Sequence, residues 1–336
     1  MDVAGLLALV FTCLFFRMNA VVLLLALVAY VHLVWGDGRL EYLVEDMWIS
    51  LDNDLLLAIP MFLIAGNIMT RGSIAKRLIR VTMLATDPLP GGMGVATVLS
   101  CALFAAISGS SPVTLLAVGA ILYPALREAG YSKRFSLGAI TSGGTLGIVI
   151  PPSIPLIVYG LVTEKSVADL FIAGIGPGIL LTAVLAGYSF WVNRHLPSKS
   201  FDLPAFVIAL KEGIWSMLLP VILLGGIYSG YFSPTEAASI GAFGAIALGW
   251  LKGTLTLEKL TAAIRESVLV SCALFMIIIG ATLFSNFVVQ TRLPDTLLSL
   301  ARGAELSPWL VMGLIIVIYI VLGFFTSPSM SWSEKS

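Results

Sequence analysis

The 336-residue chain is 58% hydrophobic and only 11% charged, and its mean hydropathy is +1.01. This composition is typical of a polytopic membrane protein and excludes a small soluble domain. The formal net charge is zero, which argues against a nucleic-acid partner, and no P-loop, HExxH or GxSxG motif occurs. Cys13, Cys101 and Cys272 lie far apart in apolar runs, so we expect buried hydrophobes rather than a disulfide or a metal site.

The chain begins with two predicted helices, at residues 3–16 and Met18–Trp35. Because no basic residue precedes its apolar run, the first is expected to be a retained helix rather than a cleaved signal. Residues 37–54 carry six acidic side chains against the single Arg39, so this segment is expected outside the cell. Residues 1–54 are thus predicted to form N-terminal scaffold helices.

The stretch 91–126 is predicted to be a re-entrant hairpin. A crossing helix at Leu55–Met69 and a mixed basic and apolar segment at Ile74–Leu84, typical of a membrane-surface helix, come before it. Basic residues flank the stretch on both sides: Arg71, Lys76, Arg77, Arg80, Arg127, Lys133 and Arg134. The positive-inside rule places both flanks in the cytoplasm, so the stretch enters and leaves by one face. A single kinked spanning helix is the alternative.

The rest of the chain is predicted to be helical as well. Further crossings are expected at 135–162, 170–192, 213–232, 237–251 and 267–290, followed by an amphipathic piece at 293–302 and a half-helix at 309–325. Ser166 with Asp169 and Ser233 with Glu236 have the spacing of capping boxes. Glu236 is also a candidate proton carrier, but the capping role is favoured.

The order of elements predicts an inverted repeat. Gly66 and Gly109 are 43 residues apart, as are Gly280 and Gly323, and each pair flanks a surface segment and a half-helix. One unit starts inside and the other outside, which is typical of secondary transporters. The predicted domains are the first repeat unit at 55–162, central scaffold helices at 163–266, a second repeat unit at 267–325 and a polar tail at 326–336.

Two breaks interrupt the apolar runs, at Ser108–Pro112 and at Gly143–Pro152. The arms on either side of Ser108–Pro112 are each roughly 20 Å long, too short for a hydrocarbon core of about 30 Å. Ser111 is a candidate N-cap and Pro112 suits the first helical position. Lipid cannot satisfy the backbone groups freed at a break, so such breaks persist where they line a polar cavity or bind something. We expect the two breaks to form one site.

This site has the chemistry to bind a cation and an anion. The carbonyl end of one half-helix is negative and the amide end of the next is positive. A small hard cation fits the negative end, with oxygen ligands from Ser108, Ser111, Gly147, Ile150 and Pro151. Candidates for contact with an anionic substrate are Ser110, Thr145, Thr282, Ser285 and Asn286. The alternative is that Ser and Gly at the breaks only let the helices pack closely. Thr282, Ser285 and Asn286 would then only form hydrogen bonds between helices.

Four segments carry a resemblance to a known family. They are LLAIPMFLIAGNIM at Leu56–Met69, FAAISGSS at Phe104–Ser111, GTLGIVIPPSIPLIVYG at Gly144–Gly160 and FSPTEAA at Phe232–Ala238. They resemble the large membrane subunit of TRAP transporters, the DctM-like family, in the family's order and over nearly the whole chain to about Phe325. The resemblance implies a sodium-driven importer of organic acids in the bacterial inner membrane.

Further properties follow from the resemblance alone. It implies two partners, an extracytoplasmic solute-binding protein and a small four-helix membrane subunit, and an elevator motion of a domain with two re-entrant hairpins. The family's first sodium site maps onto the five cation ligands named above. In the family a second hairpin tip and a further broken helix follow the half-helix at 309–325, whereas here Gly323 is followed by 13 residues. We therefore expect an incomplete copy that inserts without catalysing coupled uptake.

Two other classes of protein were weighed. An intramembrane enzyme using a serine at the break is disfavoured, because no His or Lys lies near those serines within the apolar segments. The chain is therefore predicted not to be an enzyme. A channel or a non-transporting membrane scaffold remains the alternative to the transporter.

Overall fold

The computed structural model describes residues 20–35, 40–71, 74–290 and 307–326, with a few isolated positions before residue 19 and Ser299. All regular structure in these residues is helical, which confirms the prediction of an all-α protein. The chain divides into two compact units, Met1–Asp52 with Cys272–Ser336, and Asn53–Ser271. The described residues before 20 are too scattered to test the predicted helix at 3–16, and the piece at 293–302 and the tail lie almost wholly outside the described residues.

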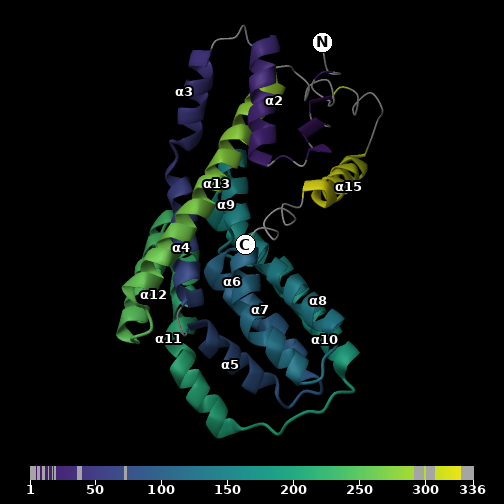
Figure 1. The fold of residues 1–336 in the computed structure, drawn as a ribbon, viewed down its shortest axis with the longest axis vertical. Helices are drawn as coiled ribbons and strands as arrows, with labels where there is room; N and C mark the ends of the chain where they lie inside the picture. The colour runs from purple at the N-terminus through teal and green to yellow at the C-terminus, as the bar shows by residue number, and fades with distance from the viewer. Residues whose placement is uncertain are drawn as a thin grey trace. The chain divides into compact units, whose positions relative to one another are not determined.

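The unit Asn53–Ser271 contains most of the helices (Figure 1). These are η1 Asp54–Leu57, α4 Ala58–Arg71, α5 Ile74–Thr86, α6 Gly92–Ser108, α7 Ser111–Glu128, α8 Lys133–Gly144, η2 Thr145–Ile148, α9 Ile154–Thr163, α10 Val167–Asn193, α11 Leu203–Tyr228 and α12 Pro234–Leu251, followed by the start of α13, Leu257–Gln290. The other unit contains α2 Ala20–Trp35, α3 Leu40–Leu51, the rest of α13, and α15 Pro308–Thr326.

Several helices are suited to cross a bilayer. Within the described part of the chain, three stretches are long and apolar enough: Asp54–Arg71, Val167–Asn193 and Leu257–Asn286. A fourth, α11, qualifies if its two parts form one span. Shorter apolar helices occur at Gly92–Ser108, Ile154–Thr163 and Trp309–Ile320, below the roughly 20 residues that a simple span needs.

Helices α6 and α7 form a hairpin with its two ends together. The backbone N–H of Gly94, near the start of α6, donates to the Tyr131 hydroxyl at 3.2 Å, and Tyr131 follows the end of α7. Leu126, Tyr131 and Ile140 form one buried cluster against which Met93 packs. The stretch 91–126 is therefore folded back on itself and is not one kinked helix. Its arms have 17 and 18 residues and are longer than predicted.

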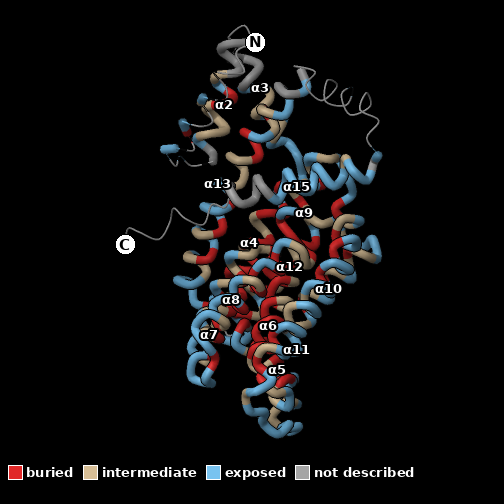
Figure 2. Tube along the Cα trace, turned by 90° about the vertical axis from the view of Figure 1, so that its right-hand side faces the viewer, coloured by how far each residue is buried: buried red, intermediate tan, exposed pale blue. Residues whose placement is uncertain are grey.

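The hairpin is enclosed by its neighbours. Helix α8 packs against both arms, α10 packs against α6, and α5 lies along α6 (Figure 1). The hydroxyls of Thr82 on α5 and Ser100 on α6 are hydrogen-bonded at 2.5 Å, and both residues are buried. Figure 2 shows buried residues concentrated along α5 and α6. The amphipathic segment predicted at 74–84 thus has its apolar face against the hairpin, while Arg80 on its outer face lies 3.6 Å from Glu212 of α11.

Helix α12 begins with the predicted capping box. The Ser233 hydroxyl accepts from the Glu236 backbone N–H at 3.2 Å, and the Glu236 carboxylate accepts from the Ser233 backbone N–H at 2.8 Å. These bonds confirm the capping role. Hydrogen bonding to the Ser233 backbone N–H and then to its side chain lowers the pKa of exposed Glu236. A carboxyl group with a lowered pKa is a poor proton carrier near neutral pH.

The unit formed by Met1–Asp52 and Cys272–Ser336 has its own small core. Val28, Ile279 and Leu283 are buried together, with Met47 packed against them. Gly280 lies so close to α2 that an added Cβ would stand 2.7 Å from the Leu24 Cβ. The acidic segment at 37–54 contains a helix, α3. Helix α15 covers the predicted half-helix at 309–325.

The hairpin geometry makes a topological prediction. In a chain without its native cysteines, single cysteines at the exposed positions Lys76 and Lys133 are expected to react from the same, cytoplasmic, face with a membrane-impermeant thiol reagent. The expectation follows from the basic flanks and from the paired ends of α6 and α7. Modification of the two positions from opposite faces would contradict it.

The capping box predicts a stability change. Ser233→Ala is expected to lower the unfolding free energy by about 1 kcal/mol, measured by thermal unfolding in detergent. Ser239→Ala is the matched control, because the Ser239 hydroxyl only donates to a carbonyl within its own helix. Since the folded pKa of Glu236 lies below its ordinary value of 4.5, the carboxylate stabilises the cap fully above pH 4.5 and loses this effect as pH falls through the folded pKa. Equal effects of the two substitutions would contradict the cap.

Candidate functional site

The chain reverses direction at the tip of the hairpin within a few residues. Helix α6 ends at Ser108, and Gly109 has φ +59° with its N–H bonded to the Ala105 carbonyl at 3.0 Å. Ser110 is extended and precedes α7, which starts at Ser111 with Pro112 in its first turn. The prediction that Ser111 is the N-cap is wrong: Ser110 holds that place, without a side-chain capping bond, because the left-handed turn falls at Gly109 and the extended residue follows it directly.

The second break lies between α8 and α9, as predicted. After Gly144 the helix tightens into the 3₁₀ turn η2, and residues 149–153 are not helical. Ser153 begins α9 as its N-cap and is completely buried. Its hydroxyl donates to the Ile148 carbonyl at 2.7 Å, so this hydrogen bond links the two ends of the break.

The two breaks are in direct contact, which confirms that they lie together. The Ile154 backbone N–H donates to the Gly109 carbonyl at 3.1 Å. An added Cβ on Gly147 would stand 2.8 Å from the Ser110 carbonyl carbon, and one on Gly109 would stand 2.7 Å from the Pro152 carbonyl oxygen. Both contacts are with backbone atoms, so only glycine allows this close approach.

The hydroxyl groups at the tip differ in their hydrogen bonding. Ser108 is completely buried, and its hydroxyl pairs with that of buried Thr114 at 2.9 Å and contacts the Ser110 carbonyl oxygen at 3.3 Å. The Ser111 hydroxyl oxygen is buried and has no hydrogen-bond partner among the described residues. A buried unpaired hydroxyl is costly and points to an absent partner. Sequence reasoning missed Thr114, although it lies one helical turn after Ser111.

The remaining predicted cation ligands lie along the second break. Gly147 and Pro151 are buried and Ile150 is half-buried. No group of three or more His, Cys, Asp or Glu side chains suited to a metal occurs in the described residues. The oxygen atoms at this junction are therefore hydroxyls and main-chain carbonyls. Such oxygens, at the carbonyl end of a half-helix, suit a small hard cation.

The residues predicted to contact substrate are not all brought together. Ser110 lies at the tip and is half-buried. Thr145 is exposed, and its hydroxyl donates to the Ser142 carbonyl at 2.6 Å. Three further candidates belong to the other unit, on α13, where the first is half-buried and the others are exposed: Thr282, Ser285 and Asn286.

Helix α4 supports the tip through Gly66. A Cβ added to Gly66 would stand 3.0 Å from both Cα and Cβ of Ser108. Gly66, which belongs to the predicted inverted repeat, therefore allows the α4 backbone to contact Ser108. Its counterpart Gly280 packs against Leu24 in the other unit, and the inverted repeat itself stays a prediction.

Long apolar helices and a joined pair of helix breaks define the chain as a polytopic helical membrane protein. Residues 6–331 match the family described as "Tripartite ATP-independent periplasmic transporter, DctM component". The chain belongs to this family, which confirms the resemblance found in its motifs.

Characterised relatives have similar sequences over most of the chain. The C4-dicarboxylate TRAP transporter large permease protein DctM of Pseudomonas aeruginosa is 37% identical over 88% of this chain and 70% of its own length. The ectoine TRAP transporter large permease protein TeaC of Halomonas elongata is 34% identical over 90% of this chain and 72% of its own. The isethionate TRAP transporter permease protein DctMQ of Oleidesulfovibrio alaskensis is 34% identical over 86% of this chain and 46% of its own.

The contact between the breaks predicts a glycine requirement. Gly147→Ala is expected to lower the unfolding free energy by about 1–3 kcal/mol, because its methyl group would overlap the Ser110 backbone. Gly138→Ala in α8 is the control, since nothing lies within 4 Å of an added Cβ there. That change is expected to be neutral or slightly stabilising in thermal unfolding. Equal tolerance of alanine at both positions would contradict the close contact.

Proposed function

We propose that this chain is the large membrane subunit of a sodium-coupled, binding-protein-dependent transporter that imports a small organic acid across the bacterial inner membrane. The observation that carries the proposal is the contact between the two helix breaks, with the unpaired Ser111 hydroxyl at their junction. Membership in the DctM family supports the transporter class.

The proposed sodium site uses Ser108, Ser111, Gly147, Ile150 and Pro151. Half-helix α6 directs its carbonyl end toward the tip, and the partial negative charge there favours a cation. The unpaired Ser111 hydroxyl supplies an oxygen that has no protein partner in the described residues. The Ser108 hydroxyl, which is already paired with Thr114, is proposed as the weaker of the two side-chain ligands.

The proposed substrate is an organic acid bound beside the sodium ion. The amide end of α7 is the positive end of a helix and favours an anion. Ser110 lies at that end, and the bound cation would add further positive charge. The names of relatives include C4-dicarboxylate, ectoine, isethionate and 2,3-diketo-L-gulonate transporters, so we propose the acid class rather than one compound.

We further propose that the hairpin unit moves as an elevator and enters the membrane from the cytoplasmic face. The paired ends of α6 and α7 support re-entry. The tripartite family description supports two partners, a small membrane subunit and an extracytoplasmic solute-binding protein.

Transport in proteoliposomes tests this function. The chain, extended beyond residue 325 with the C-terminal part of a C4-dicarboxylate relative, is reconstituted with that relative's small membrane subunit and solute-binding protein, and labelled C4-dicarboxylate is the probe. The proposal expects accumulation above the outside concentration under an inward sodium gradient, and none with potassium in its place. Equilibration without accumulation would indicate the alternative, a channel, and a lack of any flux would indicate a scaffold.

The sodium site predicts a graded effect of two substitutions. Ser111→Ala is expected to raise the sodium concentration for half-maximal thermal stabilisation of the purified chain about 5- to 30-fold, equivalent to about 1–2 kcal/mol. Ser108→Ala is expected to act in the same direction by less, because Thr114 already pairs with its hydroxyl. Ser229→Ala, at an exposed helix end, is the control. Unchanged sodium dependence in both tip variants would show that the serines only pack.

A further inference from the structure

A buried amide joins α4 to α13. Asn67, only 5% exposed, donates from Nδ2 to the Ser267 hydroxyl at 2.8 Å, and Ser267 is completely buried. The Ser267 hydroxyl in turn donates to the Ala263 carbonyl at 2.8 Å. A buried amide is retained in an apolar helix only where its hydrogen bonds are made, so this bond fixes how the two helices face each other.

The residue before Asn67 is the one that touches the tip. Gly66 brings the α4 backbone against Cα and Cβ of Ser108, and successive residues of a helix point about 100° apart. Adjacent positions on α4 therefore contact two different elements, the hairpin tip through Gly66 and α13 through Asn67. A shift or rotation of α4 relative to α13 would move the surface on which Ser108 rests.

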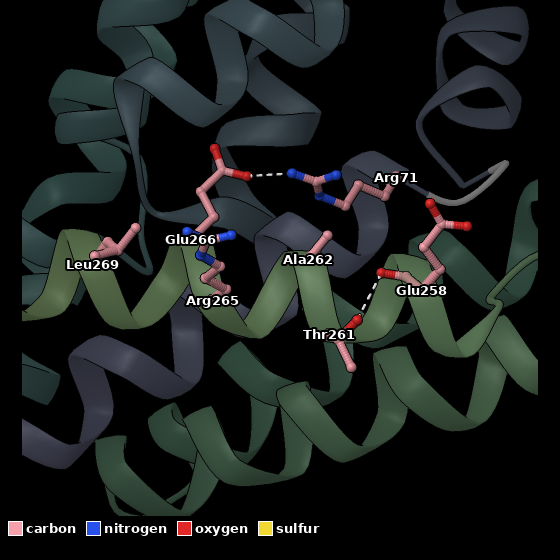
Figure 3. A pocket seen from close by; sticks show the side chains of 7 residues that line it. All are labelled: Arg71, Glu258, Thr261, Ala262, Arg265, Glu266 and Leu269. Carbon is pink, nitrogen blue, oxygen red and sulfur yellow. Dashed lines mark hydrogen bonds and ion pairs between the residues drawn. The ribbon is translucent and has the colours of Figure 1, made fainter.

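The seam between α4 and α13 also has an exposed polar contact. One turn after Asn67, Arg71 forms an ion pair with Glu266 at 2.5 Å, and the two side chains are 37% and 44% exposed. Figure 3 shows this pair among the side chains that line an open pocket, together with Glu258, Arg265 and Leu269. The pocket has a volume of about 460 Å³. Exposed ion pairs contribute little, so the buried Asn67–Ser267 bond is expected to be the stronger of these two polar contacts.

We propose that Asn67 is a positioning residue for the cation site at the hairpin tip. By bonding to Ser267 it holds α4 against α13, and thereby holds Gly66 against Ser108 at the tip of the hairpin. Among the described residues, no hydrogen bond joins Asn67 to the Ser108 or Ser111 hydroxyl. The inference rests on the proposed sodium site.

A sodium titration of the purified full chain tests the role. Thermal unfolding is followed in sodium chloride and potassium chloride mixtures at constant ionic strength, and the sodium concentration for half-maximal stabilisation is recorded. Asn67→Ala and Ser267→Ala are each expected to raise it about three- to tenfold, while saturating sodium still stabilises. The double variant is expected to match the single ones, because both remove the same bond. Ser267→Thr keeps a hydroxyl and is expected to restore the wild-type value.

The controls separate positioning from general weakening. Arg71→Ala, which breaks the exposed ion pair on the same seam, is expected to change the half-maximal concentration less than twofold. Ser267→Ala removes a single oxygen, so it keeps the test decisive if Asn67→Ala folds poorly. A sodium response that Ser111→Ala alters and Asn67→Ala leaves unchanged would overturn the positioning role alone. A wild-type chain with no sodium-specific response would overturn the proposed sodium site and this role together.

Discussion

The backbone hydrogen bond from Ile154 to Gly109 joins the two helix breaks of the unit Asn53–Ser271. It joins two points where the regular helix is interrupted: one point supplies a hydrogen-bond acceptor and the other a donor. The Gly109 carbonyl follows the last turn of α6, and the Ile154 N–H opens the first turn of α9, so both are groups that a helix end leaves without an intrahelical partner. In an apolar surrounding, leaving either group unpaired is costly, so the two breaks stabilise each other.

Small residues make this contact available. Gly147 and Gly109 let the two backbones touch, and Gly66 lets α4 reach the tip from another side. Helix α12, which packs on α4, also buries small residues, with four alanines 3% exposed or less: Ala237, Ala238, Ala242 and Ala245. Close approach of this kind replaces the hydrophobic driving force that is absent between helices in lipid. Glycine and alanine in this unit therefore determine which surfaces meet.

The sequence predicted much of the fold because its signals were local. Proline, glycine and serine are common at helix ends, so the breaks at Ser108–Pro112 and Gly143–Pro152 and the cap at Ser233 were predicted from the sequence. Boundaries were less accurate: α13 starts at Leu257 rather than Ser267, because its first turns carry charges that hide a helix from hydropathy. The pairings of Thr114 with Ser108 and of Asn67 with Ser267 were not predictable, because they join residues that only the folded chain brings together.

The hairpin is closed at both ends by chain that follows it. At its base the Tyr131 hydroxyl, beyond α7, holds the start of α6, and at its tip the first residue of α9 holds Gly109. Residues 92–154 thus contain the hydrogen bonds that fasten the hairpin at its base and tip, while the support from Gly66 of α4 lies outside them. A chimaera between relatives that exchanged only the two arms would separate them from both fastenings, whereas one that exchanged 92–154 as a block would transfer the site with its closures intact. Exchange of this site between related proteins is therefore expected to involve residues 92–154 as one block.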